Sequence, residues 1–263
     1  MKIEQLYVYP LKSARSITRE EVEVVQTGFL RDREFAVINT EEQIITAREN
    51  PALLNIKVAL RGDLLELSAD DQEPICIDYT KDFQNKVQIE LFKIPTEGLL
   101  AEHPINKWLS HLLDQSCRLV MIDKQKPRFS SKSKSEIPIN FCDASPIHLV
   151  TTASLENLNK RLKKQVKIGR FRPNIVVSGS KPFEEEFWKN IKIGNCIFEV
   201  VSCTKRCTMI TIDPDTSQKD KDQQPLRELA SYKKAEGGVD FGVYLVPKST
   251  GTLKLSDAIS VNS

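Results

Sequence analysis

Histidine is scarce in this chain, and this limits the chemistry that the sequence can support. The 263 residues include only three histidines, His103, His111 and His148, and none has a second metal ligand at a useful spacing. Zinc sites and histidine acid–base catalysis are therefore poorly supported. Because His148 stands inside an apolar run, we expect it to be a satisfied core residue.

Long apolar runs, export signals and phosphate-binding glycine motifs are also lacking. No stretch of about 18 apolar residues occurs, so the sequence predicts no membrane span. Residues 1–9 lack the charged-then-apolar build of a signal peptide and are typical of a strand, so a cytoplasmic location is expected. Neither G-x-x-x-x-G-K-[ST] nor G-x-G-x-x-G is present, which argues against a nucleotide cradle. A formal net charge of +2 provides no general basic field, so no nucleic-acid partner is expected.

The six cysteines are spread along the chain, and only Cys203 and Cys207 are close together. Without an export signal they are expected to stay reduced. Lys205 and Arg206 stand between the pair and favour a thiolate, which is a soft metal ligand or a nucleophile. A buried, inert thiol is the alternative. No cluster of four cysteines follows residue 207, so no fused iron–sulfur domain is expected.

Short alternating apolar runs dominate the sequence and predict a mainly β protein with some α. Three helices are predicted, at 105–113, at about 153–164 with Thr151 or Thr152 as its cap, and at 225–232. The first part is expected to be a small barrel or curled sheet with a closing helix. The predicted strands are 3–9, 21–25, 35–38, 56–60, 64–68, 75–78, 87–91, 147–150, 174–178, 191–193, 196–201, 209–212 and 241–246.

A polar, basic segment at 124–137 is the best boundary in the chain. It is either a solvated flexible loop or a loop that folds over a bound anion.

Cations recur at strand ends beside turn residues, in distant parts of the chain. They are Lys12-Ser13, Arg31-Asp32-Arg33 and Arg170-Phe171-Arg172-Pro173-Asn174. Arginine suits phosphate and other flat anions because its two-pronged geometry matches them. Each motif alone is more typical of a solvated or salt-bridged surface. Together they indicate a shared anionic ligand.

Read together, these motifs resemble the MOSC proteins, in the order and spacing of the amidoxime-reducing component branch, over nearly the whole chain. Tyr9-Pro10-Leu11-Lys12-Ser13, Leu30-Arg31-Asp32-Arg33 after Gly28, and Ile45-Thr46-Ala47-Arg48 are similar to the N-terminal β-barrel region of that family. Ser145-Pro146, Phe171-Arg172-Pro173-Asn174, Arg206-Cys207 and Asp213-Pro214-Asp215-Thr216 are similar to the MOSC domain itself. The resemblance implies an N-terminal β-barrel domain over 1–120 and a MOSC β-barrel domain over 121–263.

The resemblance also implies a cofactor, molybdenum bound to molybdopterin, with Cys207 as the metal ligand and catalytic residue. Molybdopterin carries a phosphate, a flat polar pterin and a dithiolene, so it requires cations, hydrogen-bonding side chains and one soft thiolate. Pyridoxal phosphate is not expected. The residues implied to hold the cofactor are Lys12, Ser13, Arg33, Ser145, Arg172, Asn174, Arg206 and Tyr244.

The activity that the resemblance implies is an oxidoreductase that reduces N-hydroxylated compounds such as amidoximes, hydroxylamines or N-hydroxylated bases. Since no fused iron–sulfur domain is expected, electrons are expected from a separate cytochrome, ferredoxin or flavodoxin type of protein. Asp213 or Asp215 could supply protons, as could water. The alternative is a protein that carries the cofactor, or a persulfide on Cys207, without turnover. The family often has glycine where Ser217 stands, and this departure leaves substrate preference open.

Overall fold

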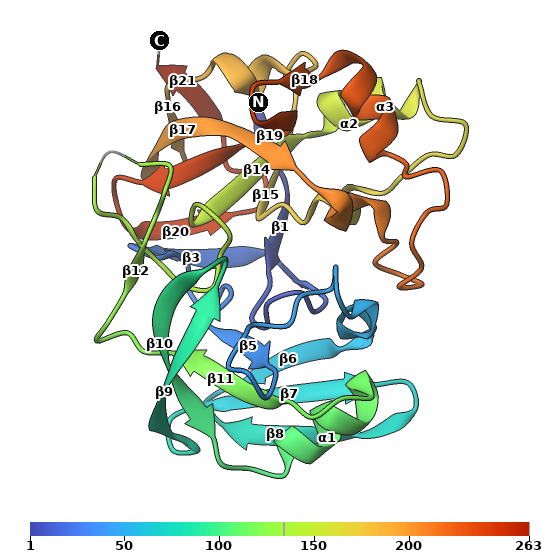
Figure 1. The fold of residues 1–263 in the computed structure, drawn as a ribbon. Coiled ribbons are helices and arrows are strands. Elements are labelled where there is room, and N and C mark those ends of the chain that lie inside the picture. The colour runs from blue at the N-terminus through green and yellow to red at the C-terminus, as the bar shows by residue number, and fades with distance from the viewer. Residues whose placement is uncertain (134, 263) are drawn as a thin grey trace.

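Strands are the commonest elements of the chain, and three α-helices occur among the described residues, as the alternating pattern predicts (Figure 1). The computed structural model describes residues 1–133 and 135–262. The helices are α1 (Ile105–Leu113), α2 (Thr152–Asn159) and α3 (Leu226–Tyr232). The first strands are β1 (Lys2–Val8), β2 (Ile17–Arg19), β3 (Glu21–Val25), β4 (Gly28–Phe29), β5 (Phe35–Ile38), β6 (Lys57–Arg61), β7 (Leu64–Ala69), β8 (Gln72–Asp78), β9 (Phe83–Leu91), β10 (Ile94–Ala101) and β11 (Arg118–Ile122). The later ones are β12 (Arg128–Phe129), β13 (Pro138–Ile139), β14 (Ile147–Thr151), β15 (Ile175–Ser178), β16 (Asn190–Ile193), β17 (Cys196–Arg206), β18 (Lys234–Ala235), β19 (Gly238–Pro247), β20 (Gly251–Lys254) and β21 (Ile259–Asn262).

The largest sheet joins the start of the chain to its second half. Its order is β2-β1-β15-β14-β19-β17-β16-β21, with β18 paired to β19. The first strand β1 runs antiparallel to β15, and β3 pairs with β20, so the first thirty residues lie against the C-terminal part (Figure 1). This connection brings the turns that follow β1 to the ends of β14 and β15. The division of the chain near residue 120 stays a prediction.

Residues 35 to 122 form a second body of sheet, with the order β5-β11-β10-β9 and a separate β6-β7-β8 meander. The helix α1 closes this part, because Ile105, Leu109 and Leu113 recur at three-to-four spacing and bury one face against it. The sequence pattern did not predict the strands β10 and β11. Pro95, Glu97 and Gly98 interrupt the apolar alternation in β10.

Two element predictions are corrected by the structure. Residues 209–212 were expected to be a strand, but Thr208–Thr211 form a short 3-10 helix directly after β17. The helix α2 ends at Asn159 rather than near 164. The Asn159 side chain bonds both the N–H and the C=O of Val166, which closes the turn there. Its start is as expected, with the Thr151 hydroxyl accepting from the Ser154 N–H at 3.2 Å.

The basic segment 124–137 is held to the protein by ion pairs where the structure describes it. Lys124 pairs with buried Glu34, and Lys126 pairs with Glu97 on β10. Within the segment, β12 pairs with β13. The ammonium groups of Lys124 and Lys126 therefore form ion pairs within the fold and are not available to a bound anion.

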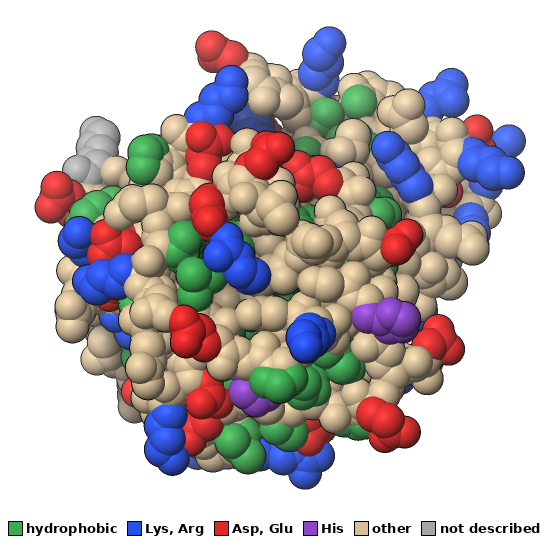
Figure 2. Space-filling model, turned by 60° about the horizontal axis from the view of Figure 1, so that its bottom comes forward, with side chains coloured by type: hydrophobic (Ala, Val, Ile, Leu, Met, Phe, Trp, Pro, Cys, Tyr) green, Lys and Arg blue, Asp and Glu red, His purple; other side chains and the backbone are tan. Residues whose placement is uncertain are grey.

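The molecular surface carries both signs of charge side by side. On the face drawn in Figure 2, lysine and arginine side chains are interspersed with aspartate and glutamate. This mixture agrees with the small net charge. Across the described part of the chain, no helix is long and apolar enough to cross a membrane.

Candidate functional site

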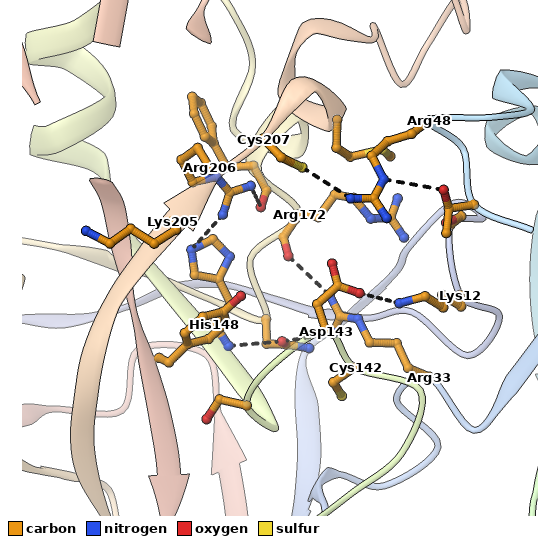
Figure 3. Close-up of a pocket in the computed structure, with 17 residues that line it drawn as sticks. Lys12, Arg33, Arg48, Cys142, Asp143, His148, Arg172, Lys205, Arg206 and Cys207 are labelled. Carbon is orange, nitrogen blue, oxygen red and sulfur yellow. Dashed lines mark hydrogen bonds and ion pairs between the residues drawn. The ribbon is translucent and has the colours of Figure 1, made fainter. Parts of the chain in front are cut away.

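A cavity is lined by residues of the turns after β1, β4 and β5, of the segments before β14 and β15, of β14 and β19, and of the end of β17. Figure 3 shows its lining side chains. All nine residues singled out from the sequence line it, although they are spread over more than 230 positions. The full lining is Lys12, Ser13, Arg33, Thr46, Arg48, Cys142, Asp143, Ser145, His148, Phe171, Arg172, Asn174, Lys205, Arg206, Cys207, Met209 and Tyr244.

One wall of the cavity is built on a buried carboxylate, Asp32, which is fully shielded from solvent. Asp32 forms an ion pair with Arg33 and accepts hydrogen bonds from the Tyr9 N–H at 2.8 Å and Asn174 Nδ2 at 3.0 Å. The side-chain Oδ1 of Asn174 in turn accepts from Arg33 Nη1 at 3.0 Å and from the His148 N–H at 3.2 Å. This network fixes the Arg33 guanidinium between the segment that follows β1 and the region of β14 and β15.

Tyr9 provides a flat platform beneath two of the cations. The guanidinium carbon atoms of Arg33 and Arg172 lie 4.6 and 4.3 Å from the centre of its ring. Burial raises the pKa of the Tyr9 hydroxyl to about 12, and that hydroxyl donates to the Pro173 carbonyl at 3.1 Å. Tyr9 is therefore a neutral stacking surface at ordinary pH and does not act as a base.

The guanidinium groups of Arg172 and Arg206 are only partly hydrogen-bonded by the protein itself. The Nη2 atom of Arg172 and the Nε atom of Arg206 are buried and have no hydrogen-bond partner. Burial lowers the pKa of Arg172 to about 10, and burial also lowers the pKa of Arg206. Buried donors without partners are uncommon in folded proteins, so these two indicate a place for a bound anion or acceptor.

Lys12 and Asp143 form the opposite edge of the cavity. The Lys12 ammonium is buried, donates to the Phe141 carbonyl at 2.8 Å and forms an ion pair with the more exposed Asp143. Desolvation raises the pKa of the Asp143 carboxyl, but the charge and hydrogen bond of Lys12 outweigh it and lower that pKa overall. Asp143 is therefore an anion at neutral pH.

The two neighbouring cysteines have different surroundings. Cys207 ends the extended chain just after β17, is exposed and lines the cavity, with Arg48 Nη1 3.9 Å from its sulfur (Figure 3). Cys203 lies within β17 opposite Val243 and is half-buried, and burial raises the pKa of its thiol. Of these two cysteines, only Cys207 lines the cavity and is placed to meet a ligand there.

The turn after Cys207 is clamped by Arg170. Its guanidinium donates to the Thr211 carbonyl at 2.9 Å and to the Asp213 carboxylate at 2.9 Å. Asp215 pairs with Lys167 at 2.6 Å. Asp213 and Asp215 thus lie outside the cavity lining, so the structure does not place either for proton delivery there.

His148 is a core residue, as expected, but its ring also reaches the cavity. Its Nε2 lies 3.5 Å from Arg206 Nη1, and its ring centre is 6.0 Å from that of Tyr244 on the adjacent strand β19. Burial first, then the charges of Arg206 and Arg33, lower its pKa well below the usual value. The ring is therefore neutral. Its neighbour Gly242 has φ +77°, and a Cβ there would approach the His148 Nε2 to 2.6 Å.

The sequence pattern did not single out Arg48, Asp143, His148 or Lys205 as site residues. Arg48 ends the Ile45-Thr46-Ala47-Arg48 motif and Asp143 stands two residues before Ser145, so both were close to a recognised signal. Lys205 extends away from the cluster (Figure 3) and pairs with Asp240 at 2.9 Å.

Comparisons with known proteins identify the family. Residues 1–116 match the MOSC N-terminal beta barrel domain, and residues 136–260 match the MOSC domain. Mitochondrial amidoxime reducing component 2 of Rattus norvegicus is 34% identical over 98% of this chain and 82% of its own length. Mitochondrial amidoxime-reducing component 1 of Mus musculus is 33% identical over 98% and 81%. The solved YUAD protein from Bacillus subtilis is 12% identical, with a TM-score of 0.47 over 100% of this chain and 95% of that one. The chain belongs to the MOSC family, in the group that contains the amidoxime-reducing components.

Proposed function

We propose that this protein is a reductase of N-hydroxylated compounds that holds a molybdenum cofactor in the cavity, with Cys207 as the protein's ligand to the metal. The observation that carries the proposal is the convergence of Lys12, Arg33, Arg172 and Arg206 around the exposed Cys207 thiol. The names of the relatives, amidoxime-reducing components, support the substrate class.

The residues present fit a molybdopterin. The unpartnered Nη2 of Arg172 and Nε of Arg206 are buried donors that its phosphate or pterin would satisfy. The guanidinium groups of Arg33 and Arg172 stack on the Tyr9 ring, and together they form a flat cationic surface. Among the described residues, no group of three or more His, Cys, Asp or Glu side chains could hold a metal ion. In our proposal Cys207 is therefore the single protein ligand, and the dithiolene supplies further sulfur.

When bound, the cofactor supplies the two-electron redox chemistry and a metal at which an N–O bond can break. The protein's own side chains hold and shield it. Asp32 and Asn174 fix Arg33, Arg170 fixes the turn that carries Cys207, and burial keeps the His148 ring neutral beside Arg206. Lys12 and Ser13 close the edge that faces Asp143.

The overall reaction consumes two electrons and two protons: R–NH–OH becomes R–NH₂ and water. The electrons come from a separate electron-transfer protein of the cytochrome, ferredoxin or flavodoxin type. A cytoplasmic location stays a prediction, and the relatives quoted above are named mitochondrial.

Protein produced in a host that makes the cofactor provides the test. We expect about one molybdenum and one pterin per chain, and reduction of benzamidoxime to benzamidine with a reduced dye as donor. Protein that carries neither metal nor pterin under these conditions would contradict the proposal.

The exposed thiol of Cys207 also fits a carrier of the cofactor or of a persulfide, because a carrier must offer its sulfur to a partner. Such a protein would release sulfur on treatment with cyanide and would show no reductase activity. The same preparation distinguishes the two functions.

A further inference from the structure

The hairpin between β9 and β10 has an unusual tip. Leu91 pairs with Ile94, which leaves Phe92 and Lys93 as a two-residue turn with φ +54° and +63°. Turns of this kind favour Asn-Gly, because both central residues must adopt positive φ. A bulky residue in this region is a true outlier, and such strain persists where the surroundings enforce it. Phe92 is nevertheless 44% exposed.

This turn places the Phe92 ring beside two cations that line the cavity. Its centre is 5.3 Å from the Arg48 guanidinium and 5.6 Å from the Lys12 ammonium. On the other side, Arg48 Nη1 reaches the Cys207 sulfur at 3.9 Å. Arg48 therefore lies between an aromatic ring and the thiol that our proposal assigns to the metal.

Three of the six lysine and arginine side chains of the lining pair with a carboxylate, and Arg48 is one of the three that do not. Lys12 pairs with Asp143, Arg33 with Asp32 and Lys205 with Asp240. Among the described residues, no carboxylate lies within ion-pair distance of Arg48, and its remaining hydrogen bond goes to the Thr46 hydroxyl at 3.4 Å. Within the described part of the chain, Arg172 and Arg206 also have no ion pair, but they are more buried and are assigned to the cofactor. Arg48 is thus the exposed one of these three charges.

We infer that Arg48, held in place by Phe92, selects substrates by charge: it favours a carboxylate or another oxyanion on a molecule whose reacting group enters the cavity beside Cys207. The identity of the reacting group rests on the proposed function. The charge selection itself does not, because it depends only on the position of Arg48 beside the thiol.

Alkylation of the cofactor-free protein tests the selection directly. Iodoacetate and iodoacetamide react with the same thiolate but differ in charge, so the ratio of their rate constants is independent of how much thiolate is present. With peptide mapping to isolate Cys207, we expect Arg48→Gln to lower the iodoacetate/iodoacetamide ratio roughly threefold to tenfold. Phe92→Leu should lower it less, and Arg48→Lys should largely retain it.

Cys76 provides an internal control in the same samples. It is exposed and its sulfur lies 3.8 Å from the Glu66 carboxylate, so its ratio should be lower than that of Cys207 and should not respond to Arg48. A Cys207 ratio that is the same in wild type and Arg48→Gln would overturn the inference.

The loaded enzyme extends the test to substrates. In Arg48→Gln, kcat/KM for a carboxylated benzamidoxime should fall several-fold relative to kcat/KM for neutral benzamidoxime. An unchanged ratio of the two values would contradict selection of substrates. If wild type reduces no N-hydroxylated compound, the proposed function fails, and the alkylation ratio still decides whether Arg48 selects by charge.

Discussion

Arg172 carries its charge in surroundings that disfavour it. Its Nη2 atom is buried without a partner, and burial lowers its pKa to about 10. A buried charge without full compensation destabilises a folded protein, so its presence is better explained by ligand binding than by stability.

Arg172→Gln should therefore stabilise the cofactor-free protein and weaken its hold on the cofactor. If removal of the buried charge raises the free energy of unfolding by about 1 kcal/mol, Tm should rise by roughly 2–4 °C for a chain of this size. Thermal unfolding of cofactor-free protein and the pterin content of loaded protein are the two measurements.

Arg161→Gln is the matched control, because Arg161 also stacks on a tyrosine, Tyr232, at 4.1 Å but lies outside the cavity lining. It should leave pterin content at the wild-type level. A lower Tm in Arg172→Gln with full pterin content would contradict the role given to Arg172.

Among the elements, β19 depends on a glycine at the point where it passes His148. Gly242 has φ +77°, and an added Cβ would lie 2.6 Å from the Leu149 carbonyl oxygen on β14. Gly242→Ala should lower the free energy of unfolding by about 2–5 kcal/mol, from the backbone conformation and the overpacking together.

Gly62→Ala separates these two causes. Gly62 has φ +58° in the turn between β6 and β7, with nothing within 4 Å of its Cβ position. Gly62→Ala should lower the free energy of unfolding by only about 1–2 kcal/mol. Equal losses in urea unfolding of the two variants would show that the contact with β14 has no effect.

The ion pair between Glu97 on β10 and Lys126, in the segment after β11, forms a clamp. The pH dependence of the free energy of unfolding should report this clamp. Glu97 accepts hydrogen bonds from Lys126 at 2.9 Å and Lys86 at 3.1 Å, and these lower its pKa to about 2 from 4.5. Because the folded-state pKa is the lower one, Glu97 stabilises the fold fully above about pH 4.5 and loses this contribution as the pH falls towards 2. Glu97→Gln should flatten the decline of the urea midpoint in this window, and Lys126→Gln should flatten it less. Identical profiles for wild type and Glu97→Gln would contradict the clamp.

Element prediction from sequence succeeded where apolar spacing alone decides the structure. The helix at 105–113 was predicted at its observed bounds because Trp108, Leu109, Leu112 and Leu113 recur at three-to-four spacing. It failed where distant side chains decide. Arg170, some forty residues upstream, bonds the turn that follows Cys207, and a local pattern at 209–212 cannot show this contact.

At the scale of the whole molecule, the sequence motifs predicted more of the site than the periodicity of apolar residues did. Spacing shows neither that β1 pairs with β15 nor that Lys12 therefore reaches the cavity. The resemblance to MOSC proteins predicted that these motifs converge, and the cavity lining shows that they do. Arg48 was missed as a site residue because its importance depends on Phe92 and Cys207, which approach it only in the folded chain.

The central claim is that Cys207 is the protein's ligand to the metal, and substitution of the two neighbouring cysteines tests it most directly. A serine oxygen is a harder and weaker donor than a thiolate, so Cys207→Ser should lose most of its molybdenum and its benzamidoxime reduction while it keeps its fold. Pterin should be retained better than metal, because Lys12, Arg33 and Arg172 still line the cavity. Cys203→Ser should change both quantities little, since that thiol lies within β17, away from the cavity. Molybdenum content and activity, measured side by side for both variants, should therefore separate them, and full metal content and activity in Cys207→Ser would contradict the account.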